Sequence, residues 1–402
     1  MDASLEQNLE SCFLQDHPQF EIIFSVADPN DPAVPVVKKL LMKYPKVDAR
    51  LNVGKSFGFY KLISQGAGNV GVNPKINNVI QGYRDAKYKL IWIMDSNVQV
   101  DPGCMNRSSK CFNQPKIGLV HHLPCGIHPT NFGSALECSY LNTTHSKMYM
   151  FLNFIAVDSC VNGKSNMYRR KDLESLGGLE YFGKYLAEDN VIGQAIMRKG
   201  YTHAMTTDLA KQSLGKISIQ EFLKRRVRWI RVRKYTVTVG TLYEPFTECL
   251  LSGFLAALGF WNLFRVPMLP FLGLHVAMWF LCDTLVMARL DPSFVRMPLL
   301  FVFSWIFKEL GAFPIWIMAM SGTTVEWRGV GFHLNTDGTV RDLHSAPSPL
   351  CPYTLPAMPK FIKHFFTQSQ KSQSQSSDQP RVLRSQSRTC SKRQSQDPRT
   401  TK

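Results

Sequence analysis

Several features that would assign this chain to a common class of protein are missing from it. Its ten cysteines are scattered, and none of them forms a Cys-x-x-Cys pair or has a histidine at the spacing of a zinc site. The N-terminus has neither a basic stretch nor an apolar one, which argues against a cleaved secretory signal. Together these absences predict a catalytic or binding part that faces the cytosol with reduced thiols.

Acidic residues are also scarce, because 30 Asp and Glu stand against 47 Lys and Arg and leave a net charge of +17. A nucleic-acid partner is not expected, since aromatic residues do not alternate with the basic ones. Much of the excess lies in Lys224–Lys234 and in the C-terminal tail. A basic run before a hydrophobic block is typical of the cytosolic flank of a membrane segment. We therefore expect a membrane surface and a phosphate-bearing ligand as partners.

Long hydrophobic runs are confined to one part of the chain. They form the three segments Cys249–Phe264, Met268–Leu290 and Met297–Met320. A span needs about 20 mostly apolar residues, so the last two are long enough and the first is short. Lys308 and Glu309 would be costly in lipid unless they face protein, water or a headgroup. We expect a multi-pass membrane protein with one or two spans plus re-entrant or interfacial segments, and a pair of buried core helices is the alternative.

Upstream of these segments, strand-like runs alternate with stretches of helical periodicity. Strands are predicted at residues 20–26, 49–53, 88–94 and 117–121. Helices are predicted at residues 4–13, 34–44 and 76–86. This alternation predicts an α/β domain with a mixed, mostly parallel sheet. Ligands of such sheets bind at the carboxyl ends of the strands, where Asp28 and Asp95 fall.

Asp95 is a candidate metal ligand, because it ends a buried apolar run and is followed two residues later by Asn97. A hard divalent cation, Mg²⁺ or Mn²⁺, is held by few protein oxygens when a bound diphosphate completes its coordination shell. Asn97 stands where a stronger site would have an aspartate. The alternative is that Asp95 only caps the turn after the strand.

Two further acidic positions come at similar boundaries. Asp28 follows the strand ending at Val26 and is well placed to contact the base or ribose of a nucleotide. The same segment, Asp28–Pro32, is also ordinary turn sequence, which is the preferred interpretation of it alone. Glu188 and Asp189 begin a helical stretch, so they either cap that helix or provide Asp189 as a general base on an acceptor hydroxyl.

The most specific pattern is Arg-x-x-Arg-Trp at Arg225, Arg228 and Trp229. Arginines three residues apart on a helix share a face, and their guanidinium groups suit the oxygens of a departing diphosphate. Trp229 is suited to line a groove for the acceptor. A basic helix beside a membrane is the alternative, and it explains Arg231 and Arg233 at least as well.

These motifs, in this order, resemble those of the ceramide glucosyltransferase family. The resemblance extends from about Leu5 to about Trp327 and so covers most of the chain. It is carried by five stretches, namely Asp28–Pro32, Gly71–Asn78, Leu90–Ser96, Tyr185–Asp189 and Arg225–Trp229.

The resemblance implies a GT-A-type domain that transfers glucose from UDP-glucose to the primary hydroxyl of ceramide, with inversion. It implies a location in the Golgi membrane, with the catalytic domain facing the cytosol. The cation, held by Asp95 and Asn97, would bind together with the UDP-glucose. Catalytic roles are implied for Asp189, Arg225, Arg228, Trp229 and His145, and donor-binding roles for Asp28, Lys75, Asn77 and Asp95.

Two departures from the family pattern are expected. Family members begin with a membrane helix and a first strand that receives the uridine, and this chain is expected to lack both; residues 55–68 are expected to be an insertion. The expected parts are a catalytic domain at 1–247, membrane helices at 248–325, a segment at 326–366 and a disordered Ser/Gln-rich basic tail at 367–402. The alternative is an inactive membrane-bound relative that binds lipid or a partner. A processive polysaccharide synthase would need more membrane segments.

Overall fold

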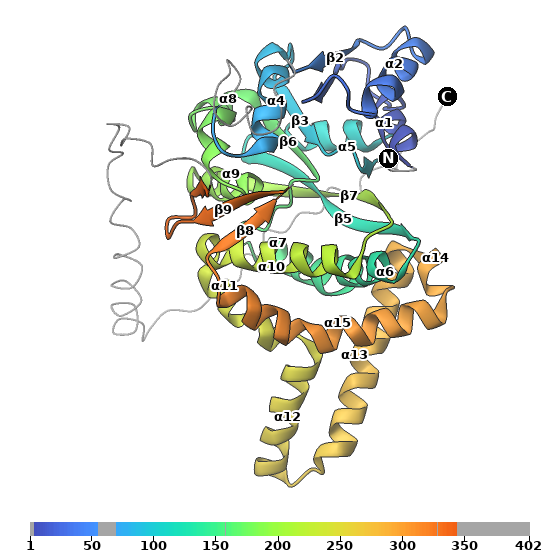
Figure 1. Cartoon of the computed structure of the whole chain (residues 1–402), viewed down its shortest axis with the longest axis vertical. Coiled ribbons are helices and arrows are strands. Elements are labelled where there is room, and N and C mark those ends of the chain that lie inside the picture. The colour runs from blue at the N-terminus through green and yellow to red at the C-terminus, as the bar shows by residue number, and fades with distance from the viewer. Residues whose placement is uncertain (1–3, 55–69, 157, 328, 344–402) are drawn as a thin grey trace, which may run out of the picture. The chain divides into compact units, whose positions relative to one another are not determined.

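A five-stranded sheet of order β3-β6-β5-β7-β4 organises the chain, of which the computed structural model describes residues 4–54, 70–156, 158–327 and 329–343. β3, β5 and β7 run in one direction, and β6 and β4 run against them. β1 and β2 form a separate parallel pair, and β8, β9 and β10 an antiparallel sheet (Figure 1). The strands are β1 (Ile22–Val26), β2 (Ala49–Val53), β3 (Leu90–Met94), β4 (Val98–Gln99), β5 (Ile117–Pro129), β6 (Ser165–Arg169), β7 (Thr202–Gly215), β8 (Thr324–Trp327), β9 (Val330–Leu334) and β10 (Val340–Asp342).

Helices lie beside these sheets and continue into the apolar part of the chain. The upstream helices are α1 (Leu5–Phe13), α2 (Ala33–Lys43), α4 (Pro74–Asp85), α5 (Cys104–Cys111), α6 (Phe132–Ser139), η1 (Tyr140–His145), α7 (Ser146–Ile155), α8 (Arg170–Glu174), η2 (Leu179–Lys184) and α9 (Glu188–Arg198). The downstream helices are α10 (Ile219–Thr236), α11 (Thr238–Tyr243), η3 (Glu244–Thr247), α12 (Cys249–Phe264), α13 (Met268–Leu290), α14 (Pro292–Val295) and α15 (Pro298–Met320). The predicted α/β class is therefore confirmed.

The longest strands exceed what the sequence pattern predicts. β5 extends to Pro129, whereas its apolar run predicts an end at His121, and it is buried at every position except His128. Histidines and a proline interrupt the apolar run, but β5 pairs in parallel with β7 over most of its length, with two irregularities of register. Pairing in the middle of a sheet outweighs the local preference of these residues.

α6, η1 and α7 form one continuous helical segment from Phe132 to Ile155, and its middle is a π-helix. The segment begins with a capping box, in which the Asn131 side chain accepts from the Ser134 backbone. Its residues around Leu141 pack with Leu214 of β7 and with Ile230 of α10. The segment therefore joins the central sheet to the apolar helices.

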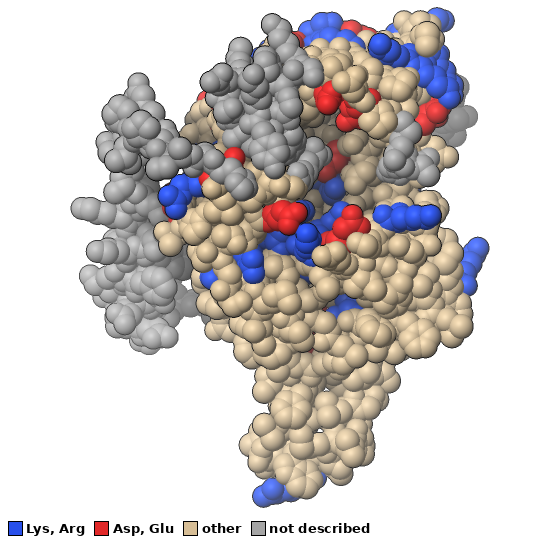
Figure 2. Space-filling model, viewed as in Figure 1, with Lys and Arg blue, Asp and Glu red and all other residues tan. Residues whose placement is uncertain are grey.

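The apolar helices have the length that the sequence predicts. α13 and α15 are long and apolar enough to cross a membrane, and α11–η3 with α12 form a third candidate that is bent by 70°. Lys308 and Glu309 of α15 are buried, and the Lys308 ammonium donates to the hydroxyls of Thr143 and Thr144 at 3.0 Å each. These charges face protein, which is one of the arrangements that the sequence allowed. Figure 2 shows few charged side chains over the α12–α13 hairpin apart from its tip.

The start of α10 provides a test of how this fold is stabilised. The Ser218 hydroxyl accepts from the Glu221 amide at 3.1 Å, and the Glu221 carboxylate accepts from the Ser218 amide at 2.7 Å. Replacing Ser218 by alanine should cost about 1 kcal/mol of unfolding free energy, because a helix-terminal amide loses its acceptor.

The corresponding fall in melting temperature is roughly 2–4 °C, and scanning fluorimetry of the detergent-solubilised chain would measure it. Lys224→Ala on the same helix is the control, because its ion pair with Glu326 is exposed and such pairs contribute little. Equal effects of the two substitutions would contradict the capping interpretation.

Candidate active site

The ammonium group of Lys75 connects three segments that are far apart in the sequence. Lys75 lies in the first turn of α4, and its Nζ is 2.9 Å from the Asp95 carboxylate at the end of β3. The same Nζ is 3.6 Å from the Glu188 carboxylate at the start of α9. Strand ends and helix starts therefore meet here, as expected for a ligand site of an α/β fold.

The ionisation of Asp95 and Lys75 depends on two opposing effects, which are burial and the opposite charge of their neighbours. Burial opposes ionisation of Asp95, but the ammonium groups of Lys164 and Lys75 outweigh it and hold the pKa of Asp95 well below its usual range. Burial likewise opposes the charge of Lys75, yet the carboxylates of Asp95, Glu188 and Asp189 raise its pKa above the ordinary value. The lysine therefore stays protonated and Asp95 stays ionised.

Glu188 and Asp189 are adjacent but differ in their surroundings. Burial, together with the neighbouring Asp189, raises the pKa of Glu188 to about 7, although Lys75 opposes that rise. Burial also raises the pKa of Asp189, again against the effect of Lys75. The Glu188 carboxylate accepts from the Asn73 side chain at 2.8 Å, so its position is fixed. One Asp189 oxygen accepts from the Asn190 amide.

The second Asp189 oxygen faces Gly163. A Cβ on Gly163 would lie 3.0 Å from Asp189 Oδ2 and 2.6 Å from Lys75 Nζ, so only glycine lets both groups approach this loop. The cavity beside this loop is lined by Lys75, Gly163, Glu188 and Asp189.

Asn73 also belongs to this site, although the sequence analysis predicted no role for it. Its fully buried side chain accepts from the backbone of Lys75 and Ile76 and donates to Glu188 and to the Tyr185 carbonyl. It thus fixes the start of α4 against the start of α9. Its position directly before Pro74, as a helix N-cap, was the available signal.

Asp95 and Asn97 fit the role of cation ligands. The Lys164 ammonium is 2.9 Å from Asp95 Oδ2 and 3.3 Å from Asn97 Oδ1, so the two oxygens converge on one positive point. Carboxylate and amide oxygens are the ligands that hard divalent cations prefer. The Lys164 ammonium therefore occupies the position to which these two oxygens would attract a cation.

A second cluster of potential ligands is less suitable. Cys104, His122 and Asp208 are buried with their ligand atoms close together. However, Asp208 is paired with Arg107, and both ring nitrogens of His122 already contact serine hydroxyls. These atoms have partners without a metal, so we assign no cation to this cluster.

The other two predicted donor-binding residues are in structural contacts. Asp28 is exposed, and its carboxylate accepts from the Asn30 amide at 2.9 Å, which is the turn arrangement considered as its alternative. Asn77 lies on α4, where its side chain bonds the backbone of Val70 and Gly71 at 3.0 and 2.7 Å. Asn77 thus holds the loop before Lys75, and a nucleotide contact by either residue stays a prediction.

His145 and Trp229 come together, although 84 positions separate them in the sequence. Their ring centroids are 5.8 Å apart, and the rings of Tyr140 and Tyr149 lie 5.9 and 5.5 Å from His145. Burial, reinforced by Arg226 and Arg233, lowers the pKa of His145 to about 3, so the imidazole is neutral. It is therefore suited to hydrogen bonding rather than to carrying a charge.

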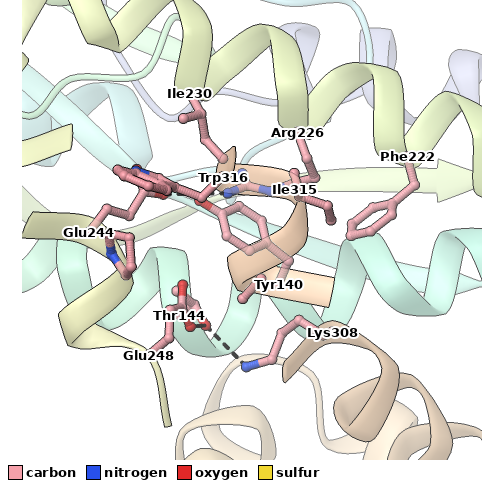
Figure 3. A pocket seen from close by; sticks show the side chains of 12 residues that line it. Tyr140, Thr144, Phe222, Arg226, Ile230, Glu244, Glu248, Lys308, Ile315 and Trp316 are labelled. Carbon is pink, nitrogen blue, oxygen red and sulfur yellow. Dashed lines mark hydrogen bonds and ion pairs between the residues drawn. The ribbon is translucent and has the colours of Figure 1, made fainter. Parts of the chain in front are cut away.

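The arginines of the motif point to different neighbours. Arg225 donates to the buried Glu137 at 3.0 Å, and the Arg228 guanidinium lies 5.7 Å from the Trp327 ring centroid. The buried guanidinium is that of Arg226, which stacks on the Tyr140 ring and lines a cavity with Glu244, Glu248 and Lys308 (Figure 3). The sequence pattern did not single out Arg226.

Carboxylates and lysines thus meet at strand ends and helix starts of an α/β domain that continues into apolar helices. The model of "Glycosyl transferase family 21" matches residues 1–340, and the chain belongs to that family. With the observed sheet, this membership confirms the GT-A-type fold class.

Relatives found by sequence similarity include proteins named ceramide glucosyltransferase. A ceramide glucosyltransferase of Komagataella phaffii is 34% identical, over 85% of this chain and 82% of its own length. Ceramide glucosyltransferase 3 of Caenorhabditis elegans is 33% identical, over 84% of this chain and 72% of its own. Among solved structures, a mannosyltransferase of Pyrobaculum calidifontis in complex with GDP-Man and Mn²⁺ has a TM-score of 0.42 at 13% identity, over 80% of this chain and 83% of its own.

The raised pKa of Glu188 predicts a pH-dependent stability. A carboxyl whose pKa is about 7 when folded and near 4.5 when unfolded holds an extra proton in the folded state between these values. Its contribution to stability therefore falls as the pH rises from about 4.5 to 7. Glu188→Gln cannot ionise, so the melting temperature of the variant should rise relative to the parent chain across this window.

The two melting curves would be compared at half-unit steps of pH. Glu180→Gln, which removes a carboxylate from an exposed ion pair with Arg84, is the control and should give a flat difference. A difference for Glu188→Gln that is equally flat would show that Glu188 titrates normally.

Proposed function

We propose that the chain transfers glucose from UDP-glucose to the primary hydroxyl of ceramide, with inversion, and so makes glucosylceramide. The single observation that supports this most strongly is the Lys75 ammonium between Asp95 and the Glu188–Asp189 pair. This ammonium lies between Asp95, where a charged donor would bind, and the acidic pair that contains the candidate base Asp189. The chain also has relatives that are named ceramide glucosyltransferases. The proposed place of action is the cytosolic face of the Golgi membrane.

On the donor side, the ammonium groups of Lys75 and Lys164 would receive the diphosphate of UDP-glucose. Asp95 and Asn97 would hold Mg²⁺ or Mn²⁺, which supplies positive charge for the departing UDP when it is bound. The two ammonium groups act in the same direction, because they offset negative charge that develops on the leaving oxygen. Asp28 and Asn77 are proposed to contact the nucleotide.

On the acceptor side, Asp189 is the proposed general base. It would take the proton of the ceramide hydroxyl while that oxygen attacks the anomeric carbon from the face opposite UDP, which inverts the configuration. Burial raises the pKa of Asp189 and so makes its carboxylate a stronger base than an exposed aspartate. Glu188, held by Asn73, would keep the start of α9 in place.

The aromatic cluster of His145 and Trp229 is proposed to line the acceptor groove. His145 of η1 is buried and Trp229 of α10 is partly buried, and Trp229 packs against a core cluster that includes residues of the apolar helices from which a lipid would arrive. Arg225 and Arg228 are proposed to stabilise the departing UDP. Arg225 would have to exchange its bond with Glu137 for one with phosphate, which makes its role conditional on a bound donor.

The base assignment predicts a selective loss of catalysis. Asp189→Asn should lower transfer by about 10²–10⁴-fold, because an amide cannot accept the hydroxyl proton. Binding of UDP should remain measurable by calorimetry, since Lys75 and Asp95 are unchanged. Labelled UDP-glucose and ceramide in membranes would give the rate.

Asp158→Asn is the matched control, because Asp158 also contacts α9, through the Gln194 side chain at 3.1–3.2 Å. It should keep near-normal turnover. If Asp189→Asn also kept it, Asp189 would not be the base.

The cation assignment predicts a graded response to metal. Chelation should abolish transfer, and Asp95→Asn should raise the Mn²⁺ concentration for half-maximal rate by at least about tenfold. Asn97→Ala should have a smaller effect, because a neutral ligand contributes less than a carboxylate. Full activity of Asp95→Asn in the presence of chelator would rule out a cation at this site.

A further inference from the structure

Three helices expose apolar side chains on the part of the molecule that carries α12 and α13. α7 exposes Met150, Phe151 and Phe154 by 55–69%, and α11 exposes Val239 and Tyr243 by about 65%. α15 exposes a stripe along its outer side, made of Leu299, Phe303, Phe307, Leu310 and Ile317. Exposed apolar surface of this extent marks a contact with a membrane or another protein.

The chain enters and leaves the apolar segments on the same side. α10 comes before them and β8–β10 after them, yet Val232 of α10 packs with Val325 and Phe332 of the later sheet. Lys234 of α10 also donates to the carbonyl of Met320 at the end of α15, at 2.8 Å. The number of membrane crossings between α10 and β8 must therefore be even. The segments of α12, α13 and α15 cannot all cross.

α15 is the segment that belongs to the body of the protein. It packs along α6 and α10, and it runs across the base of the α12–α13 hairpin rather than beside it (Figure 1). Its inner side carries polar contacts to the catalytic part, such as the hydrogen bond between Ser304 and Ser139 at 2.7 Å. It meets the second half of α13, where the Trp305 indole donates to Asp283 at 2.8 Å.

The α12–α13 hairpin has the reach that a crossing needs. The Lys147 ammonium of α7 lies 4.7 Å from the Trp279 ring centroid, and we take this contact as the point from which α13 extends away from α7 and the central sheet. Met268–Trp279 then projects by about 18 Å at 1.5 Å per residue. If α15, about 10 Å across, is immersed in the near leaflet, the tip lies about 28 Å deep, close to the roughly 30 Å of a hydrocarbon core. Arg265 at the tip would reach the far headgroups.

We propose that the chain binds the bilayer through an in-plane α15 and one crossing hairpin, α12–α13. The outer side of α15 faces the acyl chains of the near leaflet, and the exposed side chains of α7 and α11 lie in the same interface. The catalytic part and β8–β10 stay on one side, and the hairpin tip alone reaches the other. This arrangement concerns the membrane contact and holds whichever sugar and lipid the site uses.

Glycosylation mapping tests the proposal with two insertions in the full chain. A flexible loop with an Asn-Ser-Thr acceptor would be placed between Arg265 and Val266 at the hairpin tip, or between Thr336 and Asp337 in the β9–β10 turn. Each variant would be translated into endoplasmic-reticulum microsomes, and the parent chain shows the background. Both variants would first be shown to resist carbonate extraction and to elute as the parent does in detergent.

The in-plane arrangement requires the two insertions to lie on opposite sides, so one of them should gain a glycan and the other should not. Three crossings, or crossings by α13 and α15, would put the insertions on the same side. Modification of both or of neither therefore overturns the proposal.

A matched pair of substitutions gives a second test that needs no insertion. Leu274 lies within α13 and Leu310 near the middle of α15, and their exposure is similar at 65% and 58%. Leu274→Lys should lower the carbonate-resistant fraction several-fold, because its charge lies within the bilayer. Leu310→Lys should lower it by less than about twofold, because a lysine on an in-plane helix extends to the headgroups. A loss for Leu310→Lys as large as that for Leu274→Lys overturns the proposal.

Discussion

The ion pair between Lys75 and Asp95 is the interaction on which the site depends. Lys75 and Asp95 are both partly withdrawn from water, so each is stabilised in its charged form by the opposite charge of its neighbours. Because Asp95 ends β3 while Lys75 begins α4, the pair fixes a strand end against a helix start. Glu188 extends the same network to α9. Removing Lys75 would leave Glu188 and Asp189 without a neighbouring ammonium, whereas Asp95 would keep its pair with Lys164.

The sequence placed the candidate acidic residues at element boundaries, where an apolar run ends or a helical stretch begins. It did not reveal their partners. Asn73 bonds Glu188 from 115 positions away, and Lys164 reaches Asp95 from 69 positions away, and no local pattern records such contacts. Hydropathy predicted the length of α15 but not its orientation to a bilayer, because an apolar helix has a similar sequence pattern whether it crosses the bilayer or lies along it. The motif likewise marked Arg225 although Arg226 is the buried arginine.

Polar contacts also connect the apolar helices to the catalytic part. Asp283 of α13 receives Lys147 at 2.5 Å and the Trp305 indole at 2.8 Å, while Lys308 bonds the two threonines of η1. Buried charges of this kind are costly to separate once they are paired. The apolar helices α13 and α15 are therefore integral to the fold, because displacing either of them would expose unpaired charge next to the segment that holds His145.

The π-helix η1 has a consequence for how this segment tolerates change. In an ordinary α-helix an added residue would rotate every later side chain by about 100° around the axis, whereas a widened π turn takes up the extra residue. His145 lies beside Trp229 and Tyr149 is fully buried in a segment that contains this widened turn. Closing η1 into an ordinary α-helix without removing a residue would therefore rotate Tyr149 away from the core, whereas removing one residue together with the widened turn would leave it in place. The length of the segment between Ser139 and Ser146 and its widened turn thus depend on each other.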